Sequence, residues 1–182
     1  DSVTLDPHKG LFLPFGTGAI LLRDAGSLAA AQSIEADYLP GMSTQGDFDP
    51  CQLTPELSRP FRAIRLWLPI SLYGIAAWRE ALDEKLELAR FLYEELSTIS
   101  ELELPWEPEL TVVPFRLRDG SDAADRQLLD LINASKRVVL SSTVVQDRFT
   151  IRACILSHRT HRDRVEECAQ IIRRAVADVA GR

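Results

Sequence analysis

Cysteine and histidine are scarce in this 182-residue chain, with three of each. The three cysteines, Cys51, Cys154 and Cys168, form no C-x-x-C pair. An odd number of cysteines without paired spacing argues against a disulfide framework or a structural zinc site and favours a reducing compartment, so we expect a cytoplasmic protein. His158 and His161 have an H-x-x-H spacing, but arginines flank both and no third ligand is evident. This pattern predicts a solvated helix terminus and no metal site.

Excess positive charge and long apolar runs are also lacking. The net charge is −6, which argues against nucleic acid as a partner. No apolar run reaches the length that spans a membrane and no signal peptide is visible, so we expect no membrane partner. What the chain does have is an ordinary globular composition, 46% hydrophobic and 26% charged. It opens "DSVTLD" directly in a strand-like alternation, which we interpret as a fragment of a longer protein.

Short strands and a long loop are predicted for the first part of the chain. Val3 and Leu5 alternate with polar residues and indicate a strand that enters a turn at residues 7–9. The run "AILL" at 19–22 predicts a second, buried strand, and residues 25–33 favour a helix. Residues 35–60 contain four prolines and two glycines without periodicity. A loop of this length in a compact domain is usually functional or disordered.

The second part of the chain is predicted to be a small α+β domain. From Phe61 the pattern turns helical, with a break or kink expected at Pro69. A long amphipathic helix follows, and its apolar stripe is expected to comprise Ile75, Trp78, Leu82, Leu86, Ala89, Tyr93 and Leu96. Residues 110–118 predict a strand with Pro114 at an edge or bulge. A helix at 122–135, two strands joined by a turn at 146–147, and a final helix complete an antiparallel sheet covered by helices. Because strands and helices are expected in both parts of the chain, we assign the whole chain to the α/β class.

Lys9, in "LDPHKG", is the strongest candidate for chemistry. A lysine amine forms a Schiff base with an aldehyde when it is neutral and suitably placed. A lysine directly after a strand, with Pro7 in the turn and His8 beside it, can be held in this way. The same residues also suit an ordinary charged surface turn, and spacing alone leaves both interpretations open. The nearby "GTG" at 16–18 is weak support for a phosphate site, and Cys51 has no identifiable companion histidine.

The order of several segments resembles the group II pyridoxal-phosphate-dependent amino-acid decarboxylases, the family of aromatic-L-amino-acid decarboxylase. The likeness covers essentially the whole chain. It is carried by "DSVTLDPHKG" with "PFGTGAILLRD", then "SRPFRAIRLWLPISLYG", and finally "DRFTIRACILSHRT". The resemblance implies a fold type I enzyme. It implies that residues 1–74 end the large cofactor-binding domain and include its mobile loop, and that residues 75–182 are the small carboxyl-terminal domain.

The resemblance also assigns roles to individual residues. Lys9 would form the Schiff base with pyridoxal 5′-phosphate, and His8 would lie by the phosphate. Asp6 occupies a phosphate-holding position that is often Asn in the family, and its charge works against a direct phosphate contact. Tyr38, in "ADYLPG", matches the mobile-loop tyrosine of the aromatic decarboxylases and would protonate the substrate carbanion at Cα. At the substrate or loop, Arg59 and Arg62 match arginines of an "RRFR"-like stretch.

We therefore predict decarboxylation of an L-amino acid, with an aromatic-type substrate favoured, by a homodimer with pyridoxal phosphate as cofactor. Departures from the family pattern, such as Pro60 for a middle arginine and Gly10 for a common tryptophan, bear on the substrate. The family's partner for the pyridine nitrogen, its ring-stacking aromatic residue and its phosphate cradle precede the lysine segment, so this chain alone is expected to be inactive. An aldehyde synthase or carbon–carbon lyase, and a non-catalytic dimerisation or binding module, remain alternatives.

Overall fold

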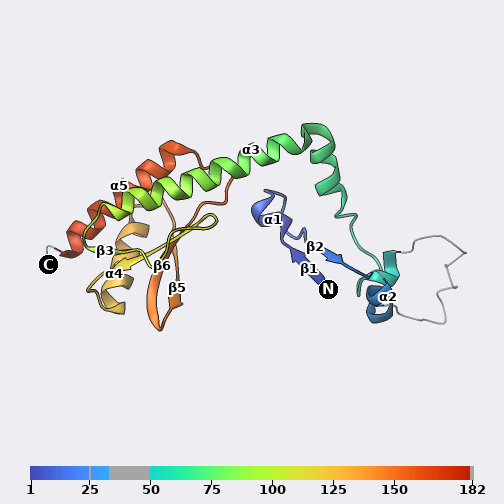
Figure 1. Ribbon diagram of the computed structural model, residues 1–182, viewed down its shortest axis with the longest axis horizontal. Helices are drawn as coiled ribbons and strands as arrows, with labels where there is room; N and C mark the ends of the chain where they lie inside the picture. The colour runs from blue at the N-terminus through green and yellow to red at the C-terminus, as the bar shows by residue number, and fades with distance from the viewer. Residues whose placement is uncertain (25, 33–49, 181–182) are drawn as a thin grey trace, which may run out of the picture. The chain divides into compact units, whose positions relative to one another are not determined.

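The computed structural model describes residues 1–24, 26–32 and 50–180, and the chain divides into two compact units, Asp1–Gly74 and Ile75–Arg182 (Figure 1). The predicted α/β class is confirmed. The assignment of the two units to a large and a small domain of an enzyme stays a prediction. Within the described residues, every helix is too short or too polar to cross a membrane.

The first unit is built on two antiparallel strands. Strand β1 (Ser2–Leu5) pairs with β2 (Ala19–Leu22), so that Leu5 lies opposite Ala19. Helix α1 (Pro7–Gly10) directly follows β1, and α2 (Gly26–Gln32) and the 3-10 turn η1 (Pro50–Leu53) come later. The prediction that 19–22 is buried is wrong for this chain, because Ile20 and Leu21 are about half exposed. Every residue of β1 is exposed as well.

Helix α3 (Ile64–Ser97) continues through Pro69 and is interrupted at Gly74. The backbone of Gly74 has φ 75° and ψ 163°, a conformation open to glycine because it has no Cβ. The break predicted at Pro69 is therefore wrong in its position. Pro69 lies in the second turn of the helix, where it removes one backbone hydrogen bond without ending the element.

The second unit contains a four-stranded antiparallel sheet in the order β3-β4-β6-β5. Its strands are β3 (Leu102–Glu103), β4 (Val112–Leu117), β5 (Ser141–Val145) and β6 (Arg148–Cys154). Pro114 lies in the interior strand β4, opposite Arg152 of β6. Strand β3 pairs only with residues 116 and 117, so Pro114 still occupies a locally unpaired edge, where a missing N–H costs little.

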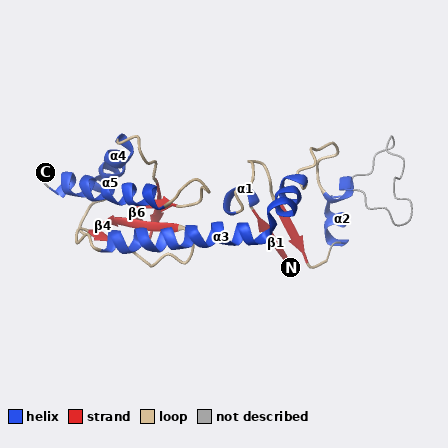
Figure 2. Cartoon of the chain, turned by 90° about the horizontal axis from the view of Figure 1, so that it is seen from above, coloured by secondary structure: helices blue, strands red, loops and turns tan. Residues whose placement is uncertain are grey.

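One face of this sheet packs against helices and forms the core. Val113 and Phe115 lie opposite Ala153 and Ile151, and all four side chains are buried. They share a core with residues of α3, α4 (Asp122–Ala134) and α5 (Arg162–Ala180). Figure 2 shows these three helices together with β4 and β6 in the second unit. The predicted face of the second strand, Phe149 to Ile155, is confirmed as buried.

The apolar stripe of α3 is rotated from the predicted one. Ala89 and Leu96 are buried as expected, but Ile75 is 60% exposed. The stripe instead follows Lys85, Leu88, Ala89, Leu92 and Leu96. Lys85 is only 1% exposed, so a cationic side chain occupies a core-facing position of the helix.

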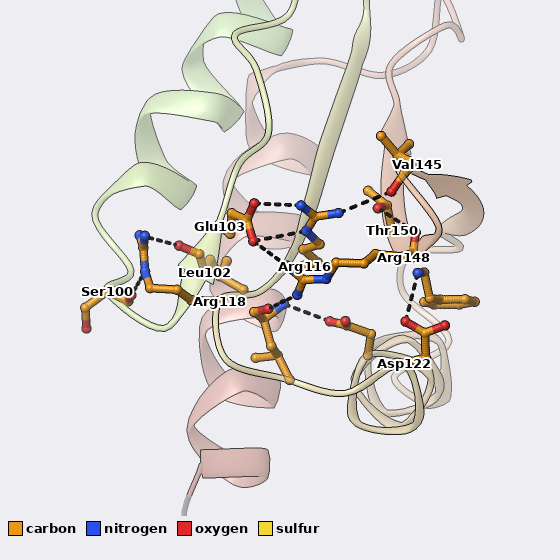
Figure 3. Close-up of polar contacts among 12 residues, drawn as sticks. Ser100, Leu102, Glu103, Arg116, Arg118, Asp122, Val145, Arg148 and Thr150 are labelled. Carbon is orange, nitrogen blue, oxygen red and sulfur yellow. Dashed lines mark hydrogen bonds and ion pairs between the residues drawn. The ribbon is translucent and has the colours of Figure 1, made fainter.

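The other face of the sheet carries a polar network (Figure 3). Glu103 accepts hydrogen bonds from Nε and Nη2 of Arg116, at 3.1 and 2.6 Å, and from Nη1 of Arg148 at 2.9 Å. Arg116 also donates to the carbonyl of Val145, and Arg148 donates to that of Leu117. Because Arg116 is only 3% exposed, these partners satisfy a guanidinium that has little access to water.

Candidate functional site

The turn after β1 positions His8 and Lys9 by backbone contacts. Pro7 occupies the start of α1, where a residue without an N–H is tolerated because that group would have no partner inside the helix. The Lys9 N–H donates to the Asp6 carbonyl at 2.8 Å, and the Leu13 N–H donates to the Pro7 carbonyl at 3.1 Å. Pro7 and Leu13 are buried beneath the turn, so the side chains of His8 and Lys9 extend from an anchored backbone.

The ring of His8 is fixed from two sides. Its Nδ1 lies 2.9 Å from the carbonyl oxygen of Thr17. The rings of His8 and Phe15 form a T-shaped pair, with their centroids 5.4 Å apart. Thr17 is 3% exposed, and its hydroxyl donates to the Pro14 carbonyl. A carbonyl oxygen only accepts hydrogen bonds, so Nδ1 of His8 must carry the proton. Nε2 is therefore the nitrogen left to bind a ligand.

Lys9 and Asp6 form an ion pair. The Lys9 amine lies 2.5 Å from Oδ2 of Asp6, with the two side chains 60% and 50% exposed. The hydrogen bond and charge of Lys9 hold the pKa of the Asp6 carboxyl below its usual range. Asp6 therefore stays ionised, and its oxygens can only accept hydrogen bonds. It suits a cation and not a phosphate, which agrees with the expected effect of its charge.

Arg59 and Arg62 lie in a second group of polar side chains. Arg62 donates to both carboxylate oxygens of Glu56, at 2.7 and 3.2 Å, and Arg59 donates to the hydroxyl of Thr54 at 2.7 Å. The Thr54 hydroxyl in turn donates to the Glu56 carbonyl. Arg62 lowers the pKa of the Glu56 carboxyl, so the pair is charged at neutral pH. These contacts fold residues 54–62 on themselves.

A hollow of about 830 Å³ runs along this second group and reaches Gly18, immediately before β2. Arg59 and Arg62 line it, whereas His8 and Lys9 do not. The structure thus pairs Asp6 with Lys9, next to His8, and the two arginines line a hollow to which neither His8 nor Lys9 contributes. Tyr38, the expected proton donor, lies outside the described residues.

Two residues of the site escaped the sequence analysis. Thr17 lies within "GTG", a motif from which the sequence analysis considered only the two glycines. The structure shows that the carbonyl of the threonine is the group that holds His8. Glu56 had no distinctive signal, because a glutamate six residues before an arginine is common in loops and pairs with it only when the loop folds back.

The donor set of the turn fits an aldehyde cofactor with an anionic group. Lys9 supplies an accessible primary amine, and a covalent anchor needs such an amine in its neutral form. His8 supplies a ring with one nitrogen fixed and the other available. The chain has two other lysines: Lys85, which is buried, and Lys136, which is exposed.

Comparison with known proteins agrees with this chemistry. A family profile described as the pyridoxal-dependent decarboxylase conserved domain matches residues 1–118. An aromatic-L-amino-acid decarboxylase of Bacillus atrophaeus is 31% identical over 181 residues, and a phenylacetaldehyde synthase of Arabidopsis thaliana is 26% identical over 182. Each match covers 94% of this chain and 37% of the relative, so the chain spans little more than a third of their length.

A solved structure gives the same result for the fold. The chain is similar to the Oryza sativa TDC solved with PLP and tryptamine, with a TM-score of 0.90 and 21% sequence identity. The match covers 98% of this chain and 39% of the rice protein. At this identity the likeness establishes a shared fold and no more.

Proposed function

The chain belongs to the family of pyridoxal-dependent decarboxylases, and from that premise we propose that it is the carboxyl-terminal part of an enzyme that decarboxylates an L-amino acid. The observation that carries the proposal is the turn in which Lys9 extends an accessible amine beside an oriented His8. Pyridoxal phosphate, when bound, supplies a ring that accepts the electron pair left at Cα as carbon dioxide departs. The remaining tasks fall to side chains.

Lys9 would hold the cofactor through its amine and would give up that place to the amine of the substrate. His8 binds an anionic group through Nε2. Because the carbonyl of Thr17 occupies Nδ1, a hydrogen bond from Nε2 to a phosphate oxygen requires the imidazolium form. In that form the ring of His8 would hold the phosphate through a charge-assisted hydrogen bond.

Tyr38 supplies the proton that Cα needs after carbon dioxide has left. A phenol is a suitable general acid when it is held close to the carbon that becomes charged. Residues 54–62 lie directly after the segment that contains Tyr38, and the contacts of Arg59 and Arg62 fix their fold. Glu56 engages Arg62 through both carboxylate oxygens. We therefore assign Arg62 to the support of residues 54–62 and not to the substrate carboxylate.

An aromatic amino acid is the favoured substrate, supported by a relative named aromatic-L-amino-acid decarboxylase. A second function is aldehyde synthesis, supported by a relative named phenylacetaldehyde synthase. The two differ in the fate of the carbanion at Cα, which is either protonated to give an amine or intercepted by oxygen. We further propose, from the family resemblance, a cytoplasmic homodimer.

The test uses the longer protein that contains this chain, reconstituted with pyridoxal phosphate. The wild type should show the visible absorbance of lysine-bound cofactor and release carbon dioxide from an aromatic amino acid. Lys9→Ala should lose the absorbance and nearly all turnover, because no other amine replaces the anchor. Lys136→Ala, a change of the same type at an exposed lysine of the second unit, should retain both. Near-normal turnover by Lys9→Ala would overturn the proposal.

A further inference from the structure

Asp6 contacts Lys9 twice, through its backbone and through its side chain. Its carbonyl accepts the Lys9 N–H at 2.8 Å, and its carboxylate accepts the Lys9 amine at 2.5 Å. Asp6 immediately precedes α1, the position from which an aspartate usually accepts a backbone N–H of the first helical turn. It makes no such side-chain capping bond here. The carboxylate is directed to the lysine instead.

This contact opposes the state that covalent attachment requires. A lysine attacks an aldehyde through a free amine, whereas here the amine is engaged by the Asp6 carboxylate at 2.5 Å. The hydrogen bond and charge of Lys9 lower the pKa of the Asp6 carboxyl, so Asp6 remains an anionic partner. The ion pair must therefore open before the amine can react.

The other charged groups around the turn do not replace Asp6. His8, within α1, is directed through Nδ1 to Thr17. Arg65 of α3 donates to the carbonyl of Phe15 at 3.1 Å and is itself a cation. Among the contacts of the described residues, the Asp6 carboxylate is thus the anionic partner of the Lys9 amine.

We propose that Asp6 is a positioning residue that holds the Lys9 ammonium whenever the lysine carries no cofactor, and that it thereby slows cofactor attachment. The inference rests on the proposed function, in which Lys9 is the anchor. Asparagine at this position would keep the size of the side chain and its ability to accept a hydrogen bond, but would remove the charge. Asp6→Asn therefore removes the electrostatic part of the contact with Lys9, and labelling in the absence of cofactor separates this effect from any effect on phosphate binding.

The first experiment measures the reactivity of Lys9 in the cofactor-free protein. The protein is labelled at pH 8 with a trace of acetic anhydride, and mass spectrometry gives the ratio of acetylation at Lys9 to that at Lys136, an internal reference. Exposed ion pairs correspond to equilibrium factors of about two to five, so the ratio should rise two- to fivefold in Asp6→Asn. Asp24→Asn is the matched control, because Asp24 is bonded to Gly26 and Ser27. An unchanged ratio in Asp6→Asn, or an equal rise in Asp24→Asn, overturns the proposal.

The second experiment follows cofactor attachment in the longer protein. Pyridoxal phosphate is added to the cofactor-free enzyme at pH 8, and the visible absorbance is recorded against time. Asp6→Asn should attach the cofactor two- to fivefold faster than wild type, because its side chain no longer forms an ion pair with the Lys9 amine. Equal rates would refute a role in attachment. If the wild type never acquires the absorbance, the proposed function fails, while the labelling ratio still decides the ion pair.

Discussion

Replacement of the buried lysine of α3 tests how the second unit is held together. Lys85 is 1% exposed, and its amine donates to the carbonyl of Thr160 at 2.5 Å and to Glu84 at 2.6 Å. Lys85→Met keeps most of the apolar stem and removes the charge. The carbonyl of Thr160 then loses a charge-assisted hydrogen bond at a place shielded from water, while Glu84, 38% exposed, can be hydrated and keeps its contact with His161.

The expected cost follows from these contacts. A hydrogen bond from a charged donor contributes about 1.5–3 kcal/mol, and removal of a buried ammonium recovers part of its desolvation cost. We therefore expect Lys85→Met to lower the free energy of unfolding by about 2 kcal/mol. At an m-value of about 1.5 kcal/mol/M, typical of small domains, the urea midpoint falls by roughly 1 M.

The assay is urea unfolding of the chain at pH 7, followed by circular dichroism. Lys136→Met is the matched control, because that lysine is exposed, and its midpoint should stay within about 0.5 kcal/mol of wild type. If Lys85→Met unfolds at the same midpoint as wild type or at a higher one, the buried ammonium contributes no more than a thioether. The reasoning from the Thr160 contact would then be refuted.

Three further predictions concern the sheet and the proposed proton donor. Gly120→Ala should destabilise the chain by about 1–3 kcal/mol in the same assay, because its Cβ would lie 2.5 Å from Cβ of the buried Leu117; an unchanged midpoint would contradict this. The Glu103 carboxyl has a pKa held below its usual range by Arg116, so its contribution is present above the unfolded pKa of about 4.3 and is lost as the pH falls through the folded value. The stability difference between wild type and Glu103→Gln should accordingly shrink below pH 4, and a pH-independent difference would count against it. In the longer enzyme, Tyr38→Phe should slow amine formation about a hundredfold and shift product towards aldehyde, measured side by side under air; an unchanged amine rate would show that the phenol is not the donor.

Several features of the chain could be predicted from sequence because they are local. Alternation at 2–5 and 148–154 and three- and four-residue apolar steps at 122–134 each depend on neighbours in the chain, and each produced the predicted element. The turn at Gln146 and Asp147 also formed as expected, with positive φ at both residues. The "DPHK" segment predicted a turn directly after a strand, and the short helix α1 lies there; that Lys9 anchors a cofactor stays a prediction.

The burial of Lys85, the position of the break in α3 and the available nitrogen of His8 were decided by the tertiary structure. Each depends on a contact with a residue distant in sequence, or on a choice between two residues that local sequence does not distinguish. Lys85 is a polar residue by composition, and it becomes a core residue only because the carbonyl of Thr160, 75 positions away, accepts its amine. Proline and glycine can both interrupt a helix, and α3 contains Pro69 and Gly74. The interruption lies at Gly74, because a residue without a Cβ can adopt a positive φ. Which nitrogen of His8 is available depends on the carbonyl of Thr17, a backbone group that carries no sequence signal of its own.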